Sequence, residues 1–152
     1  MATYNRGATK RLLKDLESTT LREQIGTRAF SSGALAIGSA AAKVKTVAAI
    51  QYCIANILYV KAITDDLFVH TNLTVQAANT TKYYLLTLDA SGNALITQGS
   101  STALPDCPSA NCPVGYLKIV TTATFTPATT SHAAAGITTT YVNISQMPST
   151  LV

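Results

Sequence analysis

Charged residues, tryptophan and long hydrophobic runs are all scarce in this sequence. Only 12% of the 152 residues are charged and none is tryptophan, so the charged share is about half that of an ordinary domain. The longest apolar run, residues 47–60, is shorter than the roughly 20 residues of a membrane helix, and no secretory signal follows Met1. We therefore expect no membrane segment, synthesis in the cytoplasm, and a protein that buries surface in an assembly.

Cysteine is also scarce, which limits the metal and redox chemistry of the chain. Of its three cysteines, Cys53 lies in an apolar run and is expected in the core. Cys107 and Cys112 form a local pair, either as free thiols or, in an oxidising medium, as a disulfide. A zinc site would need more cysteine or histidine at ligand spacing than the chain offers. We expect no metal and no cofactor.

The two histidines, His70 and His132, do not fall in any catalytic motif. The sequence lacks a G-x-S-x-G elbow, a glycine-rich phosphate loop and H-E-x-x-H. We expect both histidines at the surface or at strand ends. The sequence therefore favours a protein that is not an enzyme.

Positive charge is concentrated near the N-terminus. Residues 1–45 contain eight of the eleven basic residues and three of the seven acidic ones. Residues 8–25 carry a broken apolar stripe that predicts a short amphipathic helix, and Gly26 follows at a position typical of a helix end. The length suits one domain with an appendage. We predict a basic arm over residues 1–42 and a β-domain over residues 43–152.

The β-domain is organised around residues 43–63, which read as two apolar strands joined by a turn at Ala55 and Asn56. Neither strand alternates with polar residues, so we expect burial on both faces. Residues 82–88 and 94–98 predict a hairpin closed by Gly92.

Further strands are predicted at residues 67–70, 116–122 and 137–144, while residues 99–113 predict an irregular loop. The pattern favours a mainly β fold: an antiparallel β-sandwich, jelly-roll-like, or a small barrel, with an N-terminal helical or extended arm.

The arm mixes basic and apolar side chains in a way that suits docking on an acidic protein surface, where charge speeds encounter and leucines supply adhesion. Nucleic acid is the less favoured partner, since acidic residues interrupt the basic ones and no aromatic platform accompanies them. The candidate docking residues are Arg6, Lys10, Arg11, Leu12, Leu13, Leu16, Arg22, Arg28 and Phe30.

From Ser32 onward the sequence resembles small virion proteins of tailed bacteriophages. The likeness lies in the order of several blocks and covers about four-fifths of the chain. The loop PDCPSANCP departs from the plainer alanine and proline loop expected there, and the arm has no counterpart in the resemblance. The blocks are SSGALAIGSAAAKVKT, ILYVKAITDD, KYYLLTLDASGNALITQGS, PVGYLKIV and TFTPATTSHAAAGITTTYVNIS, followed by Met147, Pro148 and Ser149.

This resemblance implies a head decoration, or cement, protein: a non-enzymatic β-domain on the outer surface of the capsid, between major capsid protein subunits, that stabilises the shell. It implies the virion as location, and we expect a homo-oligomer, a dimer or a trimer. The alternative is a tail-fibre or adhesin module that binds host-surface carbohydrate. Exposed aromatic residues would favour that alternative, but Tyr83, Tyr84, Tyr116 and Tyr141 fall in predicted strands, where core packing is the expected use.

Overall fold

The computed structural model describes residues 26–152, and within that range it contains strands and no helix. The helix predicted over residues 8–25 lies outside the described residues. Within residues 26–152 no helix is long and apolar enough to cross a membrane. The strands are β1 Arg28–Ala29, β2 Leu35–Ile37, β3 Lys43–Thr46, β4 Ile50–Ile54, β5 Ile57–Lys61, β6 Phe68–Val69, β7 Thr81–Asp89, β8 Ala94–Gln98, β9 Asn111–Thr121 and β10 Ile137–Asn143.

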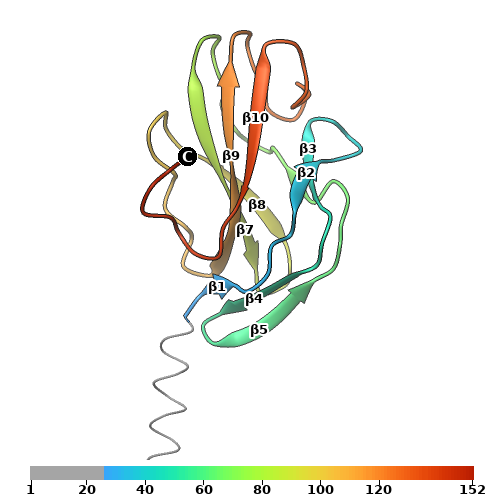
Figure 1. Cartoon of the computed structure of the whole chain (residues 1–152), viewed down its shortest axis with the longest axis vertical. Coiled ribbons are helices and arrows are strands. Elements are labelled where there is room, and N and C mark those ends of the chain that lie inside the picture. Colours follow the sequence, from blue (N-terminus) through green and yellow to red (C-terminus); the bar gives the residue numbers. More distant parts are fainter. Residues whose placement is uncertain (1–25) are drawn as a thin grey trace, which may run out of the picture.

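The strands form three antiparallel sheets (Figure 1). The largest has the order β10-β9-β7-β8, and two three-stranded sheets have the orders β1-β4-β5 and β2-β3-β6. Figure 1 shows the four-stranded sheet along the long axis, with β1, β4 and β5 crossing one end. None of these sheets closes into a barrel in the part of the chain that the structure describes. The prediction of a mainly β, sandwich-like antiparallel fold is confirmed, and the barrel alternative is not found.

The core lies between the four-stranded sheet and the two smaller ones. Alternate residues of β7, namely Tyr84, Leu86 and Leu88, enter a single apolar cluster, and β4 contributes Ile50 and Tyr52 to it. Side chains alternate across a strand, so the intervening residues of β7 face the other way. They are buried too, as the burial pattern of β7 shows.

The chain end covers part of that second face. The backbone N–H of Val152 donates to the hydroxyl of Tyr116 at 3.2 Å, and the hydroxyl of Tyr83 donates to a backbone oxygen of Val152 at 3.4 Å. Gly99, at the start of the loop after β8, donates to the carbonyl of Tyr83 at 2.7 Å. The four-stranded sheet is therefore covered by strands on one side and, at Tyr83 and Tyr116, by the C-terminal residues on the other.

β9 is longer than predicted, because it begins at Asn111 inside the expected loop. Pro113 lies within the strand, opposite Thr87, where the register between β7 and β9 shifts. A bulge is one of the few sheet positions that tolerate proline, which has no N–H to donate. β10 pairs with β9 only as far as Gly115, so Pro113 interrupts no bond to β10.

The hairpin predicted around Gly92 is confirmed. β7 and β8 flank it, and Gly92 has φ 76°. One carboxylate oxygen of Asp89 accepts hydrogen bonds from the backbone N–H groups of Ser91 and Asn93, each at 2.8 Å. The aspartate therefore closes the turn that the glycine permits.

The turn predicted at Ala55 and Asn56 is also confirmed, since both residues have positive φ, 48° and 68°. Two such residues make the type of tight turn that fits the twist of a hairpin. The expected burial on both faces holds for most of β4 but is wrong for β5. Leu58 and Val60 are each 70% exposed, because β5 is the outer strand of its sheet.

The folded body begins earlier than the predicted boundary at residue 42. β1 pairs with β4 and β2 pairs with β3, although both strands fall in the predicted arm. Leu35 belongs to the core cluster, and a Cβ added to Gly33 would lie 2.7 Å from a side-chain carbon of Ile50. The small residues of this segment allow it to pack closely against the sheet, so the sandwich includes it.

We predict that Gly115→Ala destabilises the fold by about 1–3 kcal/mol. An added Cβ would overlap the side chain of Leu35 and lie 2.7 Å from the backbone oxygen of Val142, and a paired backbone cannot yield easily. Urea denaturation measures the change. The control is Val120→Ala on the same strand, where the side chain is 38% exposed and the expected loss is below about 1 kcal/mol. Equal losses for the two variants would contradict the close-packing argument.

Candidate docking surface

The structure describes two of the candidate docking residues, Arg28 in β1 and Phe30 directly after it. The others, from Arg6 to Arg22, lie outside the described residues. The backbone N–H of Phe30 donates to the carbonyl of Gln51 in β4 at 2.7 Å, while its side chain is 47% exposed. Phe30 is therefore held by its backbone and presents its ring to the surface.

The register of β1, β4 and β5 puts Phe30 on the same face as the exposed residues of β5. Cys53 lies opposite both Arg28 and Leu58, and Gln51 lies opposite Val60. Residues two apart share a face of a strand, so this face carries Phe30, Leu58 and Val60, with the exposed amide side chain of Gln51 between Phe30 and Val60. We call the side chains of Phe30, Leu58 and Val60 the outer apolar face. The sequence suggested core positions for Leu58 and Val60, but both side chains are exposed in the structure.

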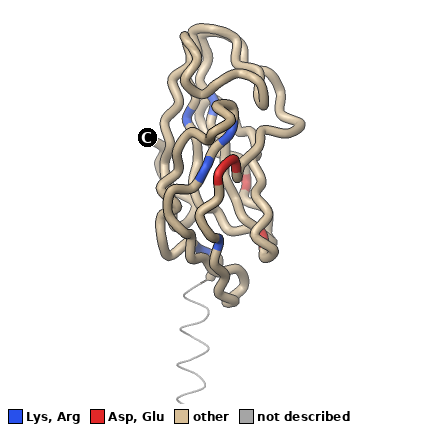
Figure 2. The backbone as a smooth tube through the Cα atoms, turned by 90° about the vertical axis from the view of Figure 1, so that its right-hand side faces the viewer, with Lys and Arg blue, Asp and Glu red and all other residues tan. Residues whose placement is uncertain are grey.

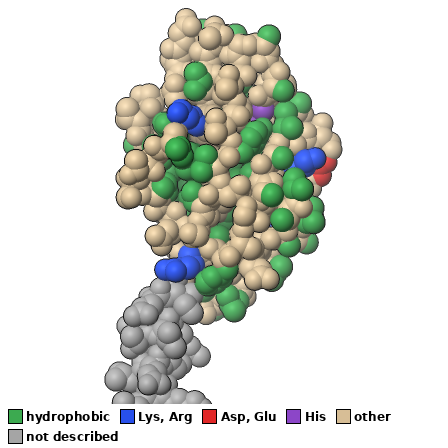
Figure 3. Space-filling view, in the orientation of Figure 1, with side chains coloured by type: hydrophobic (Ala, Val, Ile, Leu, Met, Phe, Trp, Pro, Cys, Tyr) green, Lys and Arg blue, Asp and Glu red, His purple; other side chains and the backbone are tan. Residues whose placement is uncertain are grey.

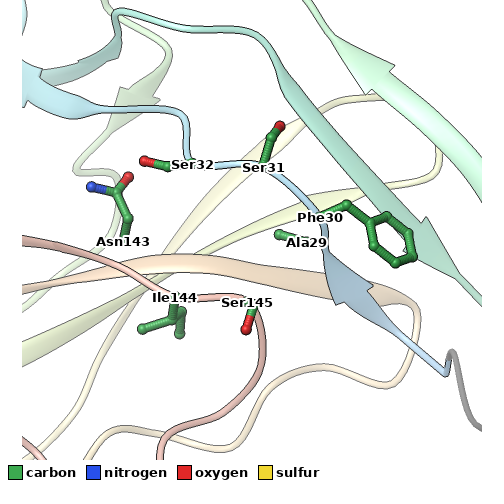
Figure 4. Close-up of a pocket in the computed structure, with 7 residues that line it drawn as sticks. All are labelled: Ala29, Phe30, Ser31, Ser32, Asn143, Ile144 and Ser145. Atoms are coloured by element: carbon green, nitrogen blue, oxygen red, sulfur yellow. The ribbon is translucent and has the colours of Figure 1, made fainter.

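An open groove borders β1 on the side away from β4. Its volume is about 270 Å³, and the chain segments 29–32 and 143–145 line it from opposite sides (Figure 4). The backbone N–H of Ala29 donates to the carbonyl of Ser145 at 2.9 Å across it. Figure 4 shows the ring of Phe30 directed away from the 143–145 segment. The groove therefore separates the start of the fold from the end of β10, and the outer apolar face lies beside it.

A second hollow, of about 410 Å³, lies between Thr27 and the loop that contains Cys107. All three cysteines, Cys53, Cys107 and Cys112, are free thiols in the structure. The disulfide considered between Cys107 and Cys112 is therefore not formed there. Burial raises the pKa of Cys112 to about 12 and also raises that of Cys107. Within residues 26–152, no three His, Cys, Asp or Glu side chains are grouped to hold a metal ion.

Charge is thinly spread over the described residues (Figure 2). Lys43 and Asp66 form a part-exposed ion pair at 3.7 Å, an arrangement worth little in water. Asp65 accepts hydrogen bonds from the N–H groups of Ser39 and Asp66, so it caps a turn. Figure 3 shows hydrophobic side chains scattered over one face, including the end that carries β4 and β5. Adhesion at this surface would be mainly apolar.

The two histidines are in the interior, which corrects the expectation of a surface position, although His70 directly follows β6 and so lies at a strand end as expected. His70 is 2% exposed and His132 is 4% exposed. Their Nε2 atoms are 2.9 Å apart, and Nδ1 of His132 lies 3.0 Å from the hydroxyl of Tyr141. The rings of Tyr84 and Phe125 pack edge-on against His70. The pair is therefore buried among the aromatic rings of Tyr84, Phe125 and Tyr141.

The hydrogen bonds restrict the protonation of this pair. Two Nε2 atoms at 2.9 Å need one donor and one acceptor, so the two histidines cannot both carry a proton there. Among residues 26–152, Nδ1 of His70 has no hydrogen-bond partner, and an unpaired acceptor is tolerated better than an unpaired N–H. We infer that His70 donates through Nε2 and that His132 donates through Nδ1 to Tyr141. Burial lowers the pKa of His70 to about 3 and that of His132 to about 4.

Gln76 fills a second buried polar position beside the histidines. Its amide nitrogen donates to the carbonyl of Ile119 at 2.9 Å, and its amide oxygen accepts from the hydroxyl of Tyr84 at 2.9 Å. A buried amide that satisfies both ends fixes the neighbouring strands in one register. Gln76 is therefore a structural polar group of the core, whereas the side chains of the outer apolar face are exposed.

Comparison with protein-family models, with curated proteins and with solved structures finds no match for this chain.

We predict that acid destabilises the protein through the two histidines. Their pKa values in the fold lie below the ordinary value near 6.5, so the unfolded chain binds more protons. Stability is complete above about pH 6.5 and falls towards pH 4 by up to about 1.4 kcal/mol per pH unit for each histidine. Urea denaturation across this range measures the slope.

His70→Gln keeps a hydrogen-bonding group beside His132 without titrating, so it should roughly halve the slope, whatever its effect on stability at pH 7. Hydrogen bonds lower the pKa of Asp65 and Asp89, so their contribution is lost only below about pH 4. An unchanged slope in the variant would refute the assignment to the histidine pair.

Proposed function

We propose that this protein is a non-enzymatic structural protein of a bacteriophage virion. In this proposal it binds the outer surface of the capsid between major capsid protein subunits and stabilises the shell, as a homo-oligomer made in the host cytoplasm. The observation that carries the proposal is the outer apolar face, where Leu58 and Val60 are each 70% exposed and Phe30 is 47% exposed. Exposed apolar groups gathered on one face are typical of a contact surface.

The position of this face supports the role given to the arm. The described chain starts at Gly26, and β1 follows two residues later at one edge of the β1-β4-β5 sheet. Residues 1–25 therefore join the fold beside Phe30. The basic segment connects to the fold next to the outer apolar face, so both can contact one partner. Charge would then speed the encounter, and apolar contact would slow release.

The structure removes one argument for the alternative, a tail-fibre or adhesin module that binds carbohydrate. Sugars stack on exposed aromatic faces, yet Tyr84 and Tyr116 are buried, Tyr83 is 7% exposed, and Tyr141 packs against His132. Phe30 is the aromatic residue among the exposed large hydrophobic side chains of the described chain. A single exposed ring beside the aliphatic side chains of Leu58 and Val60 suits an apolar protein contact better than a sugar.

The proposal predicts the copy number of the protein in purified virions. A capsid decoration protein should be present at a level comparable to the major capsid protein, because it occupies a repeated position on the shell. Quantitative mass spectrometry against the major capsid protein measures the ratio. A copy number near that of the tail proteins would instead support the fibre or adhesin role.

Removal of residues 2–25 is predicted to leave a folded β-domain that binds capsids weakly or not at all. The truncation stops before β1, because Ala29 is 3% exposed and pairs with Tyr52. Circular dichroism and a thermal melt test the fold, and co-sedimentation with shells that lack the protein tests binding. A full-length control with Lys10 and Arg11 changed to Gln separates loss of charge from loss of the segment. Unchanged binding by the truncated protein would exclude a docking role for the arm.

A further inference from the structure

The free edge of β5 has backbone groups that pair with nothing in the described part of the chain. β5 has β4 as its one neighbour in the sheet. The two-residue turn makes Ile54 and Ile57 the first hydrogen-bonded pair, and such pairs alternate along an antiparallel ladder. The N–H and C=O groups of Tyr59 therefore face β4, whereas those of Leu58 and Val60 face outward.

β4 confirms this alternation from its other side. The carbonyl of Gln51, which lies opposite Val60, accepts hydrogen bonds from the N–H groups of Phe30 and Ser31, so it is directed towards β1 and away from β5. The pair of Gln51 and Val60 is thus a non-hydrogen-bonded pair. The N–H and C=O groups of Val60 therefore point away from β4, towards the free edge.

β5 also lacks the features that usually protect an edge strand from pairing. Natural edges carry proline, bulges or several charges, whereas the sequence of β5 is ILYVK, with Lys61 at its end and regular pairing to β4. The flanking residue Ile63 is 64% exposed and Ile57 is 58% exposed. An exposed, regular and apolar edge is a template for another strand.

We propose that a second copy of this chain adds its own β5 to this edge, antiparallel, across a two-fold axis at Tyr59. Leu58 then forms a hydrogen-bonded pair with the partner's Val60, and Val60 does so with the partner's Leu58. The two β1-β4-β5 sheets become one sheet of six strands. The two outer apolar faces join into one continuous surface on it.

The residues of β5 complement a second copy of the same strand. In this register apolar Leu58 faces the partner's Val60, and Lys61 faces the partner's Ile57, so the two lysines are kept apart. An axis at Lys61 would instead put like charges opposite each other, which is unfavourable. Tyr59 already stacks on Tyr52 within one copy, with ring centroids 5.5 Å apart. Pairing of the two β5 strands therefore costs little side-chain conformational entropy at Tyr59. The same patch on both copies closes the assembly as a dimer.

The contact is small for a permanent dimer. Stable interfaces bury about 800 Å² on each partner, more than two five-residue strands provide. We therefore expect a concentration-dependent dimer with a dissociation constant on the order of micromolar. The dimer does not depend on the proposed capsid role, and it is tested without capsids.

Sedimentation of the full-length protein over a range of concentrations tests the proposal. Wild type should pass from monomer to dimer, and Leu58→Glu and Val60→Lys should each weaken dimerisation about tenfold. An equimolar mixture of these two variants should recover it, because the introduced glutamate of one copy then faces the introduced lysine of the other. Val75→Lys is the matched control, since Val75 is 54% exposed and lies outside β5; it should dimerise as wild type does.

A backbone variant tests the same contact independently of charge. Val60→Pro removes an N–H that faces outward and leaves the bonds to β4 in place, so the monomer should fold and dimerisation should be lost. A wild type that stays monomeric, a trimer, a dimer insensitive to the charged variants, or a mixture no better than its components would each overturn the proposed pairing.

Discussion

The antiparallel pairing of β7 with β9 is the constraint on which the rest of the structure depends. The two strands are the inner pair of the four-stranded sheet, and most residues of both are buried. A sheet buried on both faces must be covered twice. The three-stranded sheets cover one face, and the C-terminal residues bond to the hydroxyl groups of Tyr83 and Tyr116 on the other. Segments without regular structure are therefore part of the fold.

The β4–β5 hairpin shows how a local turn determines an exposed surface. Positive φ at Ala55 and Asn56 gives a two-residue connection, and that connection fixes the register of the strands. The register decides which side chains of β5 share a face with Phe30 and which backbone groups point away from β4. Alanine at positive φ is strained, so the surrounding pairing must maintain the turn. The turn residues Ala55 and Asn56 thus determine the composition of the outer apolar face, although neither residue is part of it.

Local sequence signals predicted much of the fold, but they predicted poorly which strands and side chains are exposed. The turns at Asn56 and Gly92 and the mainly β class follow from residue preferences that act over a few positions. The continuous apolar pattern of β5 was interpreted as burial on both faces, because composition cannot distinguish a core strand from an edge strand. The small residues before β3 indicated an arm, because close packing of Gly33 against Ile50 depends on a distant strand. The interior position of His70 likewise depends on partners 62 residues away.

The edges of the sheets differ in a way that limits any assembly. β1, at the far edge from β5, is two residues long and leads to Ser31, whose hydroxyl accepts from the N–H of Gln51. That edge cannot accept a full strand, so the six-stranded sheet would have no regular site for a further copy. β10 is a longer edge, but its sequence ITTTYVN presents threonines where β5 presents leucine and valine. A protein with so few charges has little electrostatic protection against aggregation. In the proposed dimer, closure of the β5 edge by two-fold symmetry would leave the outer apolar face directed to one side, where the proposed capsid contact would use it.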